Sequence, residues 1–128
     1  MNDIIYQVTT DNSFEETVTA VEVQTQAHGF KVLHVHDVQA TLAEKGFTRE
    51  PLKIIEVCNA KYAHTALQIE VTVSLLMPCR INVYHDGEKT VITTLRPTAL
   101  VNLFDKPELV NFAEEVDSII RKIIDSSK

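Results

Sequence analysis

The sequence predicts an α+β protein built as a two-layer sandwich. Three observations predict it: short β-branched runs alternate with capped helical segments, a two-residue hairpin signal joins the last two runs, and a strongly amphipathic helix follows them. The predicted order is β-α-β-α-β-α-β-β-α, in a single domain over residues 1–128. Segregated helices and a final hairpin favour this architecture over a doubly wound sheet.

The first three elements have clear boundaries. Residues 4–10 are β-branched and alternate in polarity, which predicts a strand. Ser13 followed by Glu16 forms a capping box at the start of a helix. Gly29 suits the left-handed turn that ends this helix, and residues 30–36 then predict a second strand.

Short polar side chains are expected to cap the two middle helices. Asp37 precedes a short helix that ends at Gly46, and Asn59 precedes another short helix. Residues 52–59 lie between these helices and predict the third strand. The middle of the chain therefore continues the alternation of strands and helices.

The last strands form a predicted hairpin. Residues 77–85 make the fourth strand, Asp86-Gly87 is a two-residue turn signal, and residues 90–95 return as the fifth strand. Pro97 then starts an irregular or helical connection.

The final helix has the clearest pattern in the chain. Pro107 belongs in its first turn. Its broad apolar stripe consists of Leu109, Phe112, Ala113, Val116, Ile119, Ile120, Ile123 and Ile124. We expect this stripe to pack across the sheet.

Composition narrows the class of protein. The 128 residues are 45% hydrophobic and carry a net charge of −6, which argues against general nucleic-acid binding. The N-terminus lacks the pattern of a signal peptide, and the longest apolar stretch, 71–77, is too short to span a membrane. Cys58 and Cys79 are then expected to be reduced, and the protein to be cytoplasmic.

Strand parity predicts which side chains share the open face of the sheet. Ile55 and Val57 are the best core pair of the third strand, so Glu56 and Cys58 take the opposite face. On the fourth strand, three alternate residues are expected to face the core, so the residues between them face the open side. The core row is Cys79, Ile81 and Val83, and the open-side residues are Arg80, Asn82 and Tyr84.

The second strand adds two imidazoles to the open face. Leu33 and Val35 are expected to face the helices. The residues expected on the open side are Phe30, Val32, His34 and His36. Apolar residues on an open face favour partial burial by a partner subunit or a ligand.

The candidate binding cluster gathers polar side chains from the three strands. Its members are Cys58, Glu56, Arg80, His36, Asn82 and Tyr84. A simpler interpretation is an open face that is polar because it meets water or a second subunit. Glu56 and Arg80 are then a structural ion pair. Cys58 is either a thiolate activated by a nearby cation or helix terminus, or a small buried hydrophobe.

Other catalytic and metal patterns are weak. Cys58, His34 and His36 have no CxxC or HxxxH spacing, so no metal site is predicted, and metal binding stays a third alternative. The sequence contains no glycine-rich phosphate loop and no GxSxG motif, and it indicates no particular cofactor.

An ordered set of short motifs resembles the domain-of-unknown-function family 302. The matching residues are Gly29-Phe30, Asp37, Cys58-Asn59 and Pro78-Cys79-Arg80. Ala60 departs from the pattern, because the family commonly has Pro after Cys-Asn. The resemblance implies a two-layer α/β fold related to the TATA-binding-protein-like class, and self-association, but no established activity.

Two functions from different classes follow. The leading interpretation is a self-associating binding or interaction module, a homodimer, with a small molecule as candidate ligand and no nucleic-acid or membrane partner. The alternative is a thiol-dependent redox or sulfur-handling protein that uses Cys58. Whether the protein is an enzyme stays open at this stage.

Overall fold

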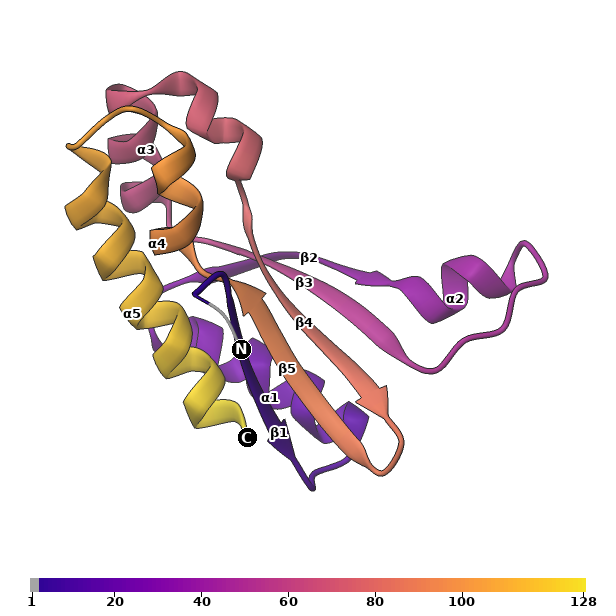
Figure 1. The fold of residues 1–128 in the computed structure, drawn as a ribbon. Helices are drawn as coiled ribbons and strands as arrows, with labels where there is room; N and C mark the ends of the chain where they lie inside the picture. The colour runs from indigo at the N-terminus through magenta and orange to yellow at the C-terminus, as the bar shows by residue number, and fades with distance from the viewer. Residues whose placement is uncertain (1–2) are drawn as a thin grey trace.

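The computed structural model describes residues 3–128 and consists of a five-stranded sheet with helices on one face and at one end (Figure 1). The strands are β1 (Ile5–Thr10), β2 (Lys31–Asp37), β3 (Leu52–Cys58), β4 (Cys79–Asp86) and β5 (Lys89–Leu95). The helices are α1 (Phe14–Ala27), α2 (Val38–Ala43), α3 (Ala60–Ile69), α4 (Pro97–Leu100) and α5 (Leu109–Ser127). Two 3-10 helices, η1 (Val71–Leu76) and η2 (Val101–Leu103), complete the described elements. The predicted α+β class is confirmed.

Every pair of neighbouring strands is antiparallel, and the order across the sheet is β1-β5-β4-β3-β2. The strands β4 and β5 turn at Asp86-Gly87, where Gly87 has a φ of 65°, as the hairpin signal predicts. The third and fourth strands are direct neighbours, so their side chains on the open face lie beside one another.

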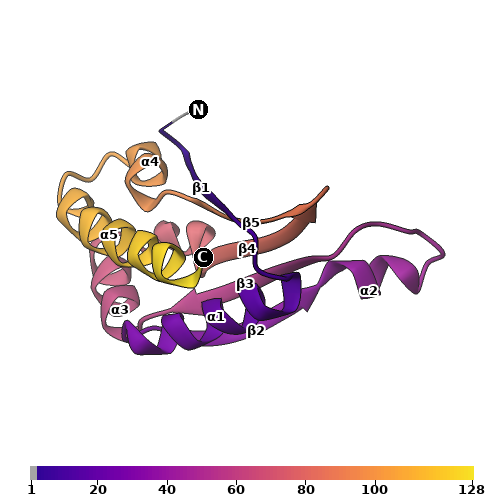
Figure 2. The ribbon, with the colours of Figure 1, turned by 90° about the horizontal axis from the view of Figure 1, so that it is seen from below.

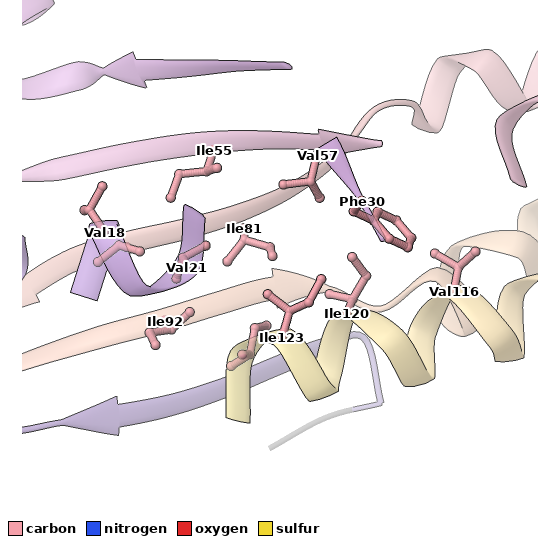
Figure 3. Close-up of a cluster of buried hydrophobic side chains, with 12 residues drawn as sticks. Val18, Val21, Phe30, Ile55, Val57, Ile81, Ile92, Val116, Ile120 and Ile123 are labelled. Carbon is pink, nitrogen blue, oxygen red and sulfur yellow. The ribbon is translucent and has the colours of Figure 1, made fainter. Parts of the chain in front are cut away.

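The main core lies between one face of the sheet and the helices α1 and α5, which pack against each other (Figure 2). The close-up in Figure 3 shows aliphatic side chains that the sheet, α1 and α5 contribute to this core. The buried members are Val18, Val21, Phe30, Ile55, Val57, Ile81, Val83, Ile92, Val116, Ile120, Ile123 and Ile124. The stripe of α5 therefore packs across the sheet, as its 3.6-residue period predicts.

The predicted helix caps are present. Ser13 Oγ accepts from the Glu16 backbone N–H, and Glu16 Oε1 accepts from the Ser13 N–H, both at 3.1 Å. Asp37 and Asn59 cap α2 and α3 through their side-chain oxygens. The Asn59 amide also donates to the carbonyl of Gly29 at 2.9 Å, which ties the end of β3 to the turn before β2.

A bulge in β2 overturns part of the predicted parity. Val32 pairs with Val57 and His34 pairs with Glu56, so Leu33 is an extra residue without a partner across the ladder. Leu33 is consequently 49% exposed instead of facing the helices. Val32 packs against the core and not on the open side.

Phe30 was also expected on the open side, and this prediction is wrong. Its ring is buried in the main core, 6.1 Å from that of Tyr62 on α3. Phe30 precedes β2, in the turn after α1, so strand parity does not set its direction. His34, Val35 and His36 keep their predicted faces because they follow the bulge.

The start of the last helix differs from the predicted one. The helix α5 begins at Leu109, and Pro107 lies in the turn before it, where its carbonyl accepts from Val110 N–H. The 3-10 helix η1 occupies most of the apolar stretch 71–77, and the connection predicted after Pro97 begins with the short helix α4. These short helices have no amphipathic period long enough to be detected in a sequence.

The shorter helical segments lie at the two ends of the sheet. The elements α3, η1 and α4 gather with the start of α5 at one end, whereas α2 projects at the other (Figure 1). A second apolar cluster lies where α3, η1, η2 and the start of α5 meet. Its buried members are Ala66, Val73, Val101, Leu109 and Ala113. No residue of α2 is buried.

Candidate functional site

The register of β2, β3 and β4 places most of the candidate cluster on the open face of the sheet. Glu56 lies between His34 and Arg80, its direct partners on the two neighbouring strands. Ile54 lies between His36 and Asn82 in the same way. Cross-strand partners have Cβ atoms about 5 Å apart, so these groups form two adjoining rows.

Glu56 is paired with a histidine. Its Oε2 lies 3.0 Å from Nε2 of His36, whereas Arg80 makes no ion pair within the described residues. The expected Glu56–Arg80 ion pair is therefore absent from residues 3–128. The hydrogen bond from His36 lowers the pKa of Glu56, desolvation opposes it, and the charges of His36, Arg80 and His34 add to the lowering.

The two cysteines are free and partly covered. Burial raises the pKa of the Cys58 thiol, although a hydrogen bond from the Asn59 backbone works in the other direction. Burial, with a smaller contribution from Cys58, raises the pKa of Cys79 to about 11. A nucleophilic cysteine needs a lowered pKa, so this environment is the opposite of the one that a redox thiol requires.

Asn82 has an unusual environment for a residue on an open face. Its Oδ1 is buried, and no hydrogen-bond donor among residues 3–128 reaches it. Such a group costs free energy because it has lost water without gaining a partner. Tyr84, the next open-face residue of β4, lies opposite Leu52 and Val91.

A cavity of about 320 Å³ opens at the end of the sheet where β4 begins and β5 ends. Its apolar lining comes from α3, η1, α4, η2, α5 and the strand ends. The apolar side chains include Ala66, Val73, Leu76, Leu100, Val101 and Phe112. Arg80 and Asn82 are the members of the candidate cluster that line it, together with Thr93 and Thr94 of β5.

The structure thus divides the candidate cluster. Arg80 and Asn82 belong to the cavity, while Glu56 and His36 form their own pair on the neighbouring strands. Cys58 and Tyr84 do not line the cavity. Strand parity could identify Arg80 and Asn82, but the apolar lining comes from segments that are distant in the sequence.

A family model described as "Domain of unknown function DUF302" matches residues 6–127. The chain belongs to this family. The crystal structure of an uncharacterized conserved DUF302 protein from Bacillus stearothermophilus matches the chain with a TM-score of 0.94 and 29% identity. This match covers 99% of the present chain and 100% of the other. No curated protein matches the chain.

In this DUF302 chain, a buried carboxylate fixes one side of the cavity. Asp117 of α5 is 2% exposed and accepts from Arg96, which directly precedes α4, and from Arg121 at 2.9 Å. Burial would raise the pKa of Asp117, but these hydrogen bonds and charges outweigh it and lower the pKa. Pro97 follows Arg96 in the sequence and Val116 precedes Asp117, and both of these residues line the cavity. The ion pair between Arg96 and Asp117 therefore holds two walls of the cavity together.

Two further properties of the DUF302 chain bear on its ligands. Within residues 3–128, no group of three or more His, Cys, Asp or Glu side chains is arranged to hold a metal ion. None of the described helices combines the length and the apolar character needed to cross a bilayer.

Proposed function

We propose that this chain is a binding module that holds a small, largely apolar molecule in the cavity at the end of its sheet. The cavity itself is the observation that carries the proposal. Its volume of about 320 Å³ lies within the range of small-molecule sites, and apolar side chains dominate its lining. Pockets of this kind bind through burial of apolar surface, while a few polar groups orient the ligand.

The position of the cavity supports a binding role. Packed interiors leave few voids larger than a water molecule, so an open space of this size beside a second apolar cluster is costly to maintain. Ala66 and Ala113 both line it and are fully buried, and larger side chains at these positions would fill the space. A bound ligand would make the van der Waals contacts that these small side chains are too short to make.

Binding of the neutral dye N-phenylnaphthylamine tests the proposal, because its fluorescence rises in an apolar site. We expect saturable binding by the natural sequence and loss of binding in Ala66→Met, whose side chain enters the cavity. Ala60→Met is the matched control, because Ala60 lies on the exposed first turn of the same helix. Equal dye binding by both variants would contradict a ligand site in this cavity.

We also propose that the chain forms a homodimer through the open face of its sheet. Leu52 and Ile54 of β3 lie on this face, and both are partly exposed. The face also carries both a carboxylate, Glu56, and basic groups, so a two-fold-related copy would present complementary charge. A second copy of the chain would cover the apolar surface that one copy leaves in contact with water.

Light scattering tests self-association directly. At micromolar concentration we expect about twice the 14.4 kDa mass of one chain. Ile54→Lys would place a charge in the centre of the proposed interface and should yield monomers. Val23→Lys is the control, because Val23 is 57% exposed on α1, away from the open face. A monomeric natural protein, or a dimeric Ile54→Lys variant, would contradict this interface.

A further inference from the structure

The ionic character of the cavity is concentrated in one side chain. Arg80 is the only charged residue among those that line it within the described part of the chain. Arg80 is itself exposed, at the start of β4, so its guanidinium lies where the cavity meets solvent. The opposite walls are formed by apolar side chains of α3, η1, α4 and α5.

The guanidinium of Arg80 is available to a ligand. Arg80 makes neither an ion pair nor a side-chain hydrogen bond with residues 3–128. Glu56, its neighbour across the strands, is close enough for its pKa to be affected by Arg80, but its carboxylate contacts His36 at 3.0 Å. An arginine without a partner beside an apolar cavity can hold a carboxylate with two parallel hydrogen bonds.

Asn82 supplies a second free polar group on the same strand face as Arg80. Its buried Oδ1 has no partner among the described residues, and no internal hydrogen bond fixes the orientation of its amide. The Nδ2 group of this amide is therefore available to donate to a ligand. The two threonines of the cavity are committed elsewhere: Thr94 Oγ1 donates to the carbonyl of Arg80 at 2.7 Å, and Thr93 Oγ1 donates to that of Tyr6 at 3.3 Å.

We propose that the cavity takes an amphipathic carboxylate, a medium-chain or aryl acid whose head group accepts hydrogen bonds from Arg80 and from Asn82 Nδ2. This inference rests on the proposed ligand-binding function. A single guanidinium suits a monoanion better than a phosphate ester with two charges, because no second cation lines the cavity. The apolar walls receive the tail, and the carboxylate stays at the solvent-exposed edge.

Displacement of bound N-phenylnaphthylamine by three ligands of equal chain length tests the head-group assignment. Octanoate should compete more strongly than octanol, and octylammonium should be the weakest. In Arg80→Gln, octanoate should lose about tenfold in affinity, which corresponds to one charge-assisted interaction, while octanol should be unaffected. Asn82→Asp should also weaken octanoate, because it places a negative charge beside the head group.

Arg49→Gln is the matched control, since it makes the same change in charge on the exposed loop after α2. Unchanged octanoate affinity in Arg80→Gln, or equal competition by octanol and octanoate in the natural protein, would overturn the head-group assignment and leave the binding function intact. Failure of the dye to bind the natural protein would instead overturn the binding function itself. Dye binding by every variant confirms that the fold is preserved.

Discussion

The guanidinium of Arg96 donates two hydrogen bonds of 3.1 Å to the carboxylate of Asp117, one from Nε and one from Nη2. Arg96 directly precedes the short helix α4, and Asp117 lies in the middle of α5. The contact therefore joins the end of the sheet to the longest described helix, next to the cavity. Arg121 shares the same carboxylate one turn further along α5.

Asp117→Asn should destabilise the fold. The amide keeps the shape of the carboxylate but loses the charge that both arginines contact. We expect a loss of about 1–3 kcal/mol in the free energy of unfolding, less than for a fully buried ion pair, because Arg96 is 28% exposed and can be hydrated. Urea denaturation measures this loss. Glu114→Gln, on an exposed position of α5, should change stability by less than about 0.5 kcal/mol.

The same substitution should make stability less sensitive to acid. The pKa of Asp117 is lowered in the folded protein, so its unfolded form binds a proton more readily. Its contribution to the free energy of unfolding is complete above the pKa of the unfolded state, about 3.9. This contribution is lost as the pH falls through the lower pKa of the folded state. The difference in unfolding free energy between the natural protein and Asp117→Asn should therefore shrink below about pH 4. A difference that stayed constant down to pH 2 would contradict the lowered pKa.

Neither cysteine should behave as an activated thiol. Because burial raises both pKa values, and that of Cys79 to about 11, we expect slow reaction of the folded protein with Ellman's reagent at pH 8. The Cys58→Ser variant separates the reaction rates of the two thiols. The protein unfolded in guanidinium gives the reaction rate of a fully exposed thiol. A thiol that reacted faster in the folded protein than in the unfolded one would revive the redox alternative.

Leu33 should be dispensable for the register of β2. Deleting it removes the bulged residue and leaves Val32 opposite Val57 and His34 opposite Glu56. We therefore expect a folded protein with a modest change in melting temperature. Deleting Val35 is the control, because it would shift His36 and Asp37 to the opposite faces of the strand. Similar melting of the two deletion variants would contradict the observed register.

Much of the fold follows from local patterns in the sequence. The caps at Ser13, Asp37 and Asn59 depend on residues within one helical turn, and the structure shows all three. The alternation in β3 and β4 is uninterrupted, so parity correctly placed Ile55 and Arg80 on opposite faces. In β2 the same reasoning failed at Leu33, because a bulge adds a residue without leaving a mark in the hydrophobic pattern.

The cavity could not be predicted in this way. Its walls come from segments as far apart as Ile5 and Val116, and only the packing of α4 and α5 at the end of the sheet brings them together. The contact of Glu56 with His36 instead of Arg80 is decided by side-chain rotamers, which parity does not specify. Arg96 and Asp117 are similarly joined by the tertiary fold, with no short motif to relate them.

The position of β1 at the edge of the sheet has a consequence for biosynthesis. Of the five described strands β1 leaves the ribosome first, yet among them it pairs only with β5, where Tyr6 lies opposite Thr94. The strands β2, β3 and β4, in contrast, each pair with the next strand along the chain. A nascent chain can therefore assemble the four-stranded meander of β2 to β5 in order of synthesis. The strand β1, in contrast, can join the sheet only after β5 has been translated.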